Sequence, residues 1–202
     1  RSQGHFTVQS RAGERLIDKQ PGASLSCDLS SNDFVLSGRV KTLRKDAEQT
    51  LQATFKHSPS GLFVRWTATL RDGSNYVRQR FAIAATRECT LHGIQLVSGQ
   101  AKGARQIGTV PGSPVASESL FFGVEMPFTV HFFEDNGFRS GFGCKLPLAG
   151  DTIYEFDSVL GVFPRGQLRR AFNYYLERER STPSHQFLHY NCWYDLGLNP
   201  TR

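Results

Sequence analysis

Three side chains near the end of the chain have types and spacing that could bind a ligand. Asn191, Trp193 and Asp195 alternate within the run YNCWYD of residues 190–195. Successive side chains of a strand point to opposite faces, so these three share one face if the run is extended, and they act together or not at all. A carboxylate there can accept strong, charge-assisted hydrogen bonds from the hydroxyl groups of a ligand. The structural alternative is a core tryptophan followed by a carboxylate that caps a helix starting near Pro200.

The residues that precede this run have a helical pattern. Apolar side chains recur at helical spacing while arginine and glutamate occupy the other face, which predicts a helix of roughly four turns over residues 166–180. The run Ser181-Thr182-Pro183 is expected to end this helix. The apolar positions are Leu168, Ala171, Phe172, Tyr175 and Leu176.

Most of the remaining chain alternates apolar and polar side chains, as half-buried strands do. In GLFVRWTATL (61–70) the alternation is regular, Asp72-Gly73 marks a tight turn, and NYVRQRFAIAA (75–85) is the returning strand. A second hairpin is expected around Asn136-Gly137, between MPFTVHFFE and FRSGFGCKL. Further strands are predicted in HFTVQ, RLIDK, DFVLSGRV, LQATFKH, TLHGIQLV, SLFFGVE and TIYEFDSVLGVF.

This spacing of strands indicates the fold class. Many short strands separated by glycine, proline, asparagine and aspartate turns favour an antiparallel sandwich. The Gly-, Pro- and Ser-rich residues 98–119 are expected to form a long surface loop. The sequence thus predicts a β-sandwich over residues 1–160, a connecting helix over 161–183 and the start of another unit over 184–202. At 202 residues the chain is long enough to bury one sizeable core.

Composition argues against several classes of protein. The net charge of +6 comes mostly from arginines spread along the chain, so no nucleic-acid partner is expected. No apolar run approaches the ~18 residues of a membrane span, and no membrane partner is expected. No cofactor is expected either, because the sequence contains neither a phosphate-binding glycine loop nor a GxSxG nucleophile motif.

The cysteines are far apart and predict no metal site. The sequence has no CxxC pair and no histidine or cysteine neighbours at zinc spacing. Buried thiols are favoured over two disulfides, whose pairing the sequence leaves open. The four positions are Cys27, Cys89, Cys144 and Cys192.

The run YNCWYDLG (190–197) resembles the first barrel strand of the α-galactosidase clan of glycoside hydrolases, families 27 and 36, whose members often carry a GWNSW-like or WCTWD-like segment there. Enzymes of this clan have a galactose mutarotase-like β-supersandwich, then a helical linker, then a (β/α)8 barrel. The order of sandwich, helix and tryptophan-bearing strand is matched across the whole chain. RDGSNYVRQRFAIA and LFFGVEMP are more loosely similar to strands of such N-terminal domains, and Cys192 departs from the usual serine or threonine.

The resemblance implies an antiparallel β-supersandwich followed by a linker helix and one isolated strand of a (β/α)8 barrel. Asn191, Trp193 and Asp195 would then face a galactoside-type glycan, with Trp193 forming a wall of the sugar subsite. The two carboxylates of retaining cleavage lie on later barrel strands in the clan, so this chain is expected to contain no catalytic residue.

The resemblance also implies partners and a location. The parent protein would be a retaining glycoside hydrolase, periplasmic or extracellular, with its signal peptide already removed. The missing C-terminal catalytic barrel would be the partner of the sandwich. The sandwich itself would shape the mouth of the active site, supply a loop to the substrate cleft, or hold a homo-oligomer together.

A self-standing carbohydrate-binding or protein-interaction sandwich is the alternative, in which the tail packs as a last core strand. Two polar features of the sandwich are compatible with both interpretations. Glu125 lies in an apolar run, and a structural ion pair with an arginine is favoured over sugar binding. Arg78 and Arg80 share a strand face, where they could bind a carboxylate or sugar hydroxyls, or could simply face solvent.

Overall fold

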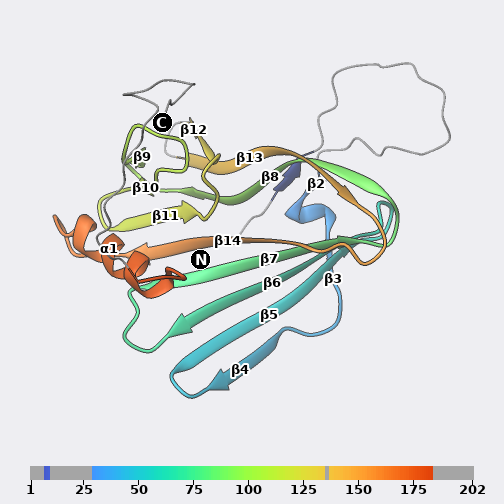
Figure 1. Ribbon diagram of the computed structural model, residues 1–202, viewed down its shortest axis with the longest axis horizontal. Helices are drawn as coiled ribbons and strands as arrows, with labels where there is room; N and C mark the ends of the chain where they lie inside the picture. Colours follow the sequence, from blue (N-terminus) through green and yellow to red (C-terminus); the bar gives the residue numbers. More distant parts are fainter. Residues whose placement is uncertain (1–6, 10–28, 135–136, 184–202) are drawn as a thin grey trace, which may run out of the picture.

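The computed structural model describes residues 7–9, 29–134 and 137–183, which form two antiparallel sheets and one α-helix (Figure 1). The larger sheet has nine strands in the order β3-β5-β6-β7-β14-β11-β10-β9, with β4 also paired to β5. The smaller sheet has the order β12-β13-β8-β1-β2. The described chain is therefore mainly β and antiparallel, and the predicted fold class is confirmed.

The bounds of the elements are as follows. The larger sheet contains β3 (Val35–Leu36), β4 (Lys41–Lys45), β5 (Glu48–His57), β6 (Leu62–Arg71), β7 (Tyr76–Ala85), β9 (Arg105–Gln106), β10 (Val115–Ala116), β11 (Leu120–Val124) and β14 (Tyr154–Val162). The smaller sheet contains β1 (Thr7–Gln9), β2 (Leu29–Ser30), β8 (Cys89–Gln100), β12 (Val130–Glu134) and β13 (Gly137–Leu148). The helices are the 3-10 turn η1 (Ser31–Asp33) and α1 (Leu168–Glu179).

Alternation along the central strands gives the larger sheet two chemically different faces. In β6, Leu62 and Val64 are buried while Arg65 is exposed. The neighbouring strand β7 continues both faces in register, because Val64 pairs with Ile83 and Arg65 pairs with Ala82. The inner face, which carries Val64 and Ile83, is therefore apolar and packs toward the smaller sheet.

The main core fills the space between the two sheets. Val64 and Ile83 of the larger sheet are each 1% exposed and belong to the same cluster as Leu91, Phe138 and Leu148 of the smaller sheet. Full burial of an aliphatic or aromatic side chain of this size stabilises the fold by about 1.5–3 kcal/mol. This cluster is thus the main source of stability in the sandwich.

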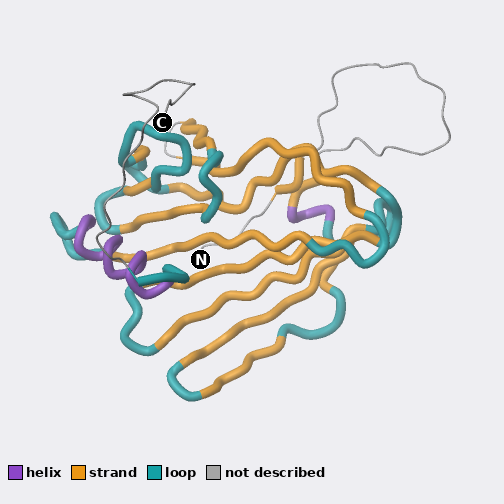
Figure 2. The backbone as a smooth tube through the Cα atoms, viewed as in Figure 1, coloured by secondary structure: helices purple, strands orange, loops and turns teal. Residues whose placement is uncertain are grey.

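A second, smaller core lies on the outer face of the larger sheet, beneath α1. Phe121 of β11 and Val159 of β14 pack there against Ala171 and Tyr175, which are one helical turn apart. Close approach at this point requires a glycine, since a Cβ at Gly161 would lie 2.0 Å from the Phe121 ring. Figure 2 shows α1, in purple, at the end of the strands where this core lies.

Both predicted hairpins and the predicted helix are present. β6 and β7 pair from Leu62–Ala85 onward, and β12 and β13 pair from Glu134–Gly137 onward. The helix α1 begins two residues inside the predicted range and ends one residue before its limit. Apolar periodicity was sufficient for the first hairpin and the helix, whereas the second hairpin was marked mainly by its turn residues, because β12 buries no face.

Two predictions were wrong in detail. Residues 98–119 are not one loop, because β8 runs to Gln100 and the two-residue strands β9 and β10 follow. Strands so short leave no alternation to detect among glycine and proline. The strand β4 was missed because all five side chains of its sequence KTLRK are exposed, so neither face is marked by apolar residues.

Several predictions fall on residues outside the described ranges. They include the strand in RLIDK and the barrel strand expected after residue 184. The predicted boundaries of the sandwich domain at residue 160 and of the connecting helix at residue 183 also stay predictions. In the part of the chain that the structure describes, no helix has the length and apolar character needed to cross a membrane.

Candidate functional site

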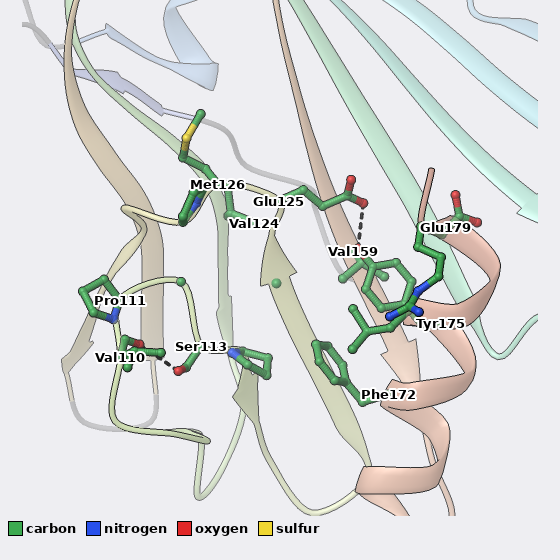
Figure 3. A pocket seen from close by; sticks show the side chains of 16 residues that line it. Val110, Pro111, Ser113, Val124, Glu125, Met126, Val159, Phe172, Tyr175 and Glu179 are labelled. Atoms are coloured by element: carbon green, nitrogen blue, oxygen red, sulfur yellow. Dashed lines mark hydrogen bonds between the residues drawn. The ribbon is translucent and has the colours of Figure 1, made fainter. Parts of the chain in front are cut away.

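An open cleft of about 480 Å3 lies beside α1 (Figure 3). Phe172 and Leu176 line it from the helix, and Val110 and Pro114 line it from the loop between β9 and β10. Val159 of β14 also belongs to the lining. Most of the lining side chains are apolar, so the cleft offers mainly van der Waals contact to an occupant, but Glu125, Glu179 and Arg180 also line it.

The loop that forms one wall of the cleft is held by its backbone. Gly112 has φ +81°, and its N–H donates to the Thr129 carbonyl at 3.0 Å. A Cβ at this position would lie 2.9 Å from the Pro127 carbonyl oxygen, so glycine satisfies both the conformation and the space. The Ser113 hydroxyl donates to the Val110 carbonyl at 2.7 Å and closes the turn.

Arg78 of β7 lies beside the cleft and joins three carboxylates. Its Nε donates to Glu125 Oε1 at 2.8 Å, and its Nη2 donates to Glu125 Oε2 at 2.6 Å. The same Nη2 donates to Asp157 Oδ2 at 2.9 Å, and Nη1 lies 3.4 Å from Glu179 Oε2. The hydrogen bond to Glu125 is the main cause that raises the pKa of Arg78 above its ordinary value. One guanidinium therefore connects β7, β14, the end of β11 and the last turn of α1.

Two tyrosines complete this network. The Tyr175 hydroxyl donates to Glu125 Oε1 at 2.7 Å, and the Tyr76 hydroxyl donates to Glu179 Oε1 at 2.6 Å. Burial first, and then the bonds to these glutamates, raise the pKa of both hydroxyls, so both stay protonated and act as donors. The two rings also meet edge to face, with centroids 5.0 Å apart.

The same network extends to β6 and β5. Arg71 of β6 donates from Nη1 to Glu179 Oε1 at 2.8 Å and from Nε to Glu48 Oε2 at 3.1 Å. Glu179 thus accepts from Arg71 and Tyr76 and lies close to Arg78. With its carboxylates engaged by donors of the protein, the network holds α1 against the sheet.

The sandwich residues singled out from the sequence lie in this network. The predicted arginine partner of Glu125 is confirmed and is Arg78. Arg78 and Arg80 do share a face, and both bind carboxylates: Arg80 Nε donates to Asp157 Oδ1 at 2.9 Å. The predicted ligand-binding residues Asn191, Trp193 and Asp195 lie outside the described residues, and their role stays a prediction.

Sequence reasoning missed Glu179, the best-buried carboxylate of the network, whose side chain is 8% exposed. A signal was present, because Glu179 follows Tyr175 by four positions and thus continues the apolar face of the helix. A carboxylate on that face needs cationic or hydroxyl partners when the helix docks. The partners themselves come from strands far away in the sequence.

Among the described residues, the cysteines and other possible metal-binding side chains add no second site. Cys89 and Cys144 are free thiols, both partly buried, and burial raises the pKa of each. Cys27 and Cys192 lie outside the described residues. Within residues 7–9, 29–134 and 137–183, no three His, Cys, Asp or Glu side chains are grouped so as to hold a metal ion.

Comparison with known proteins found no similarity in sequence and only distant similarity in structure. No protein-family model and no curated protein matches the sequence. A putative kojibiose phosphorylase from the human microbiome aligns with a TM-score of 0.42 and 9% identity, over 69% of this chain and 22% of that protein. The GH36 α-galactosidase AgaA from Geobacillus stearothermophilus aligns with a TM-score of 0.42 and 11% identity, over 82% of this chain and 30% of that protein.

A variant of the same α-galactosidase in complex with raffinose gives a TM-score of 0.41 at 10% identity, again over 82% of this chain and 30% of that protein. This chain therefore spans less than a third of the length of these solved structures. At such scores and identities the likeness does not assign an activity to the chain.

Proposed function

We propose that this chain is the N-terminal, non-catalytic part of a glycoside hydrolase that acts on α-galactoside-type glycans. In this proposal residues 1–160 are a supersandwich, residues 161–183 are the linker helix, and residues 184–202 begin the catalytic barrel. The parent enzyme would cleave with retention of configuration, using carboxylates that lie beyond this chain. The barrel and its glycan are the partners of the sandwich, which would shape the mouth of the active site.

One observation supports this proposal most directly: the helix that precedes the tryptophan-bearing run is docked on the sandwich by its last turn. Glu179 is held by Arg71, Tyr76 and Arg78. The next domain would therefore start from a defined point beside the sheet. A helix that only connected independent domains would not need a buried ion-paired carboxylate at its end.

The test compares the 202-residue chain with the protein that its gene encodes as a whole. An aryl α-galactoside should be hydrolysed by the whole protein and not by the chain alone. In the whole protein, Asn191→Ala, Trp193→Ala and Asp195→Ala should each lower kcat/KM by about tenfold or more, because each removes an interaction worth roughly 1.4 kcal/mol. Tyr194→Phe, which in this proposal would lie on the opposite face of the strand, is the matched control and should stay within about twofold.

Two outcomes would contradict the proposal. One is hydrolysis by the purified chain alone that a mock preparation lacks. The other is a reading frame that stops directly after Arg202.

The second candidate is a self-standing carbohydrate-binding or protein-interaction module, and the open cleft beside α1 favours it. Its walls would contact an occupant through Phe172, Leu176 and Val110. Titration of the chain with galactose and raffinose, followed by amide NMR shifts, separates the candidates. Saturable shifts at the cleft that Leu176→Asp abolishes would support the binding module; no shifts are expected if the chain is only the N-terminal part of an enzyme.

A further inference from the structure

The sheet edges differ in how they are protected from pairing with other strands. The described strands β2, β3 and β9 at the edges have only two residues each. The edge strand β4 is longer, but three of its five side chains, Lys41, Arg44 and Lys45, are basic. Short length and lysines are the usual means by which proteins prevent edge-to-edge association. β12, with the sequence VHFFE, has five residues and neither form of protection.

The backbone of β12 offers hydrogen-bonding groups on its open side. One side pairs with β13, from Val130–Gly141 to Glu134–Gly137. The Thr129 carbonyl accepts from Gly112 and therefore points to the other side. Alternate residues of an antiparallel strand direct their backbone to the same side, so the N–H and C=O groups of His131 and Phe133 also point there. Among the described strands, none pairs with that side.

Apolar side chains surround this open edge. Phe128, Phe132 and Phe133 are 74%, 57% and 42% exposed, and Val110 and Val130 are 63% and 49% exposed. The three phenylalanines together expose roughly 350 Å2 if each side chain has about 200 Å2, and this area is divided between the two faces of β12, because the consecutive Phe132 and Phe133 point to opposite faces. The largest exposed apolar patch of a typical monomer covers a few hundred Å2 and is often functional.

We propose that β12 pairs antiparallel with β12 of a second copy of this chain, about a two-fold axis that passes beside Phe132. His131 of one copy then lies opposite Phe133 of the other, and the outward backbone groups of both form four hydrogen bonds. Five strands from each copy join into one continuous sheet. The proposal does not depend on the glycoside hydrolase function proposed above.

A second copy fits this edge because the edge is complementary to itself. An antiparallel pair of identical strands is isologous, so every donor on one copy meets an acceptor on the other. At the axis Phe132 meets only Phe132, with no charge repulsion, whereas self-pairing of β4 would bring lysine and arginine side chains together. Arg139 lies over the Phe132 ring, 5.8 Å from its centroid, and Arg139 with Glu134 gives the patch a polar rim.

The patch is smaller than the ~800 Å2 per partner of a standard interface, so the dimer should be weak and dependent on concentration. Sedimentation velocity of the chain over a wide range of protein concentration should show a reversible monomer–dimer equilibrium. Phe132→Lys should raise the dissociation constant by about tenfold or more, because two lysines then meet at the axis. Leu43→Lys, equally exposed but on β4, is the matched control and should dimerise like the wild type.

Two variants with opposite charges at position 132 make the test specific to pairing between two copies of β12. Phe132→Lys and Phe132→Glu should each be monomeric alone, and an equal mixture should form a heterodimer, because lysine then meets glutamate at the axis. Thermal unfolding of both variants should match the wild type, since Phe132 is exposed in the monomer. A wild-type chain that stays monomeric, a dimer that Phe132→Lys leaves unchanged, or a mixture that stays monomeric would each overturn the proposal. None of these readouts depends on glycosidase activity.

Discussion

The two faces of the larger sheet are built from the same strands but hold different kinds of interaction. The inner face packs Val64 and Ile83 into the apolar core, where both are 1% exposed. The outer face carries Arg78 and Asp157 in an ion-pair network that ends on Glu179 of α1. Apolar burial is strong but not directional, whereas charge-assisted hydrogen bonds add little net stability and fix geometry. The inner face therefore stabilises the domain mainly by apolar burial, whereas the outer face combines the smaller core beneath α1 with an ion-pair network that positions the helix.

The largest difference between the faces should appear when one apolar side chain is shortened. Ile83→Ala is expected to lower the free energy of unfolding by about 3 kcal/mol, since it leaves a cavity in a close-packed core. Thr67→Ala, on the outer face of the adjacent strand, should change it by about 0.5 kcal/mol or less. Urea unfolding measures both. Equal losses for the two variants would contradict the division of the sheet into two faces.

Removing the central cation should have the next largest effect. Arg78→Met is expected to destabilise the fold by about 2 kcal/mol at neutral pH, because three neighbouring carboxylates lose their shared partner. Arg80→Met, whose guanidinium side chain is 47% exposed, should cost about 0.5 kcal/mol. The same loss for both arginines in urea unfolding would refute a central role for Arg78.

Removing a single hydroxyl group should lower the free energy of unfolding by less than removing the cation. Tyr175→Phe is expected to cost about 1 kcal/mol, because it removes the bond to Glu125. The raised pKa of Tyr175 means that the folded state keeps its proton while the unfolded state loses it above about pH 10. Wild-type stability should therefore fall more steeply than that of the variant as pH rises past that point. Tyr174→Phe, at an exposed position, is the control and should keep the wild-type slope.

The smallest effect should come from a histidine of the smaller sheet, near the rim of the sandwich. His131 bonds Ser140 Oγ through Nδ1 and the Ser113 carbonyl through Nε2, both at 2.7 Å, and burial lowers its pKa. Below about pH 6.5 the unfolded chain therefore binds more protons than the folded chain. The contribution of His131 to the free energy of unfolding is complete above that pH and is lost as the pH falls.

The loss should be about 1 kcal/mol or less by about pH 5, and His131→Gln should abolish it. The exposed His92→Gln is the control in the same urea titrations. If the free energy of unfolding of His131→Gln still depended on pH in this range, another titratable group would be the cause.

The sequence was informative wherever one face of an element is buried. The hairpin of β6 and β7 and the helix α1 follow from periodicity, because burial repeats every second residue in the strands and every three or four in the helix. The ion-pair network could be predicted only in part, as a need for an arginine beside Glu125. Its remaining bonds join distant residues: Tyr76 and Glu179 are 103 positions apart. Periodicity is a local signal and contains no information on such pairs.

The docking of the last turn of α1 has a consequence for hydrogen exchange. Helices commonly fray from both ends, but the C-terminal turn of α1 is tied to two strands through Glu179. At the N-terminal end of α1, the side chain of the N-cap residue Gln167 makes no capping hydrogen bond. Amides near Leu168 should therefore exchange first and those near Glu179 last, so α1 unwinds toward its exit. The point at which the chain leaves the sandwich is then the last part of the helix to open.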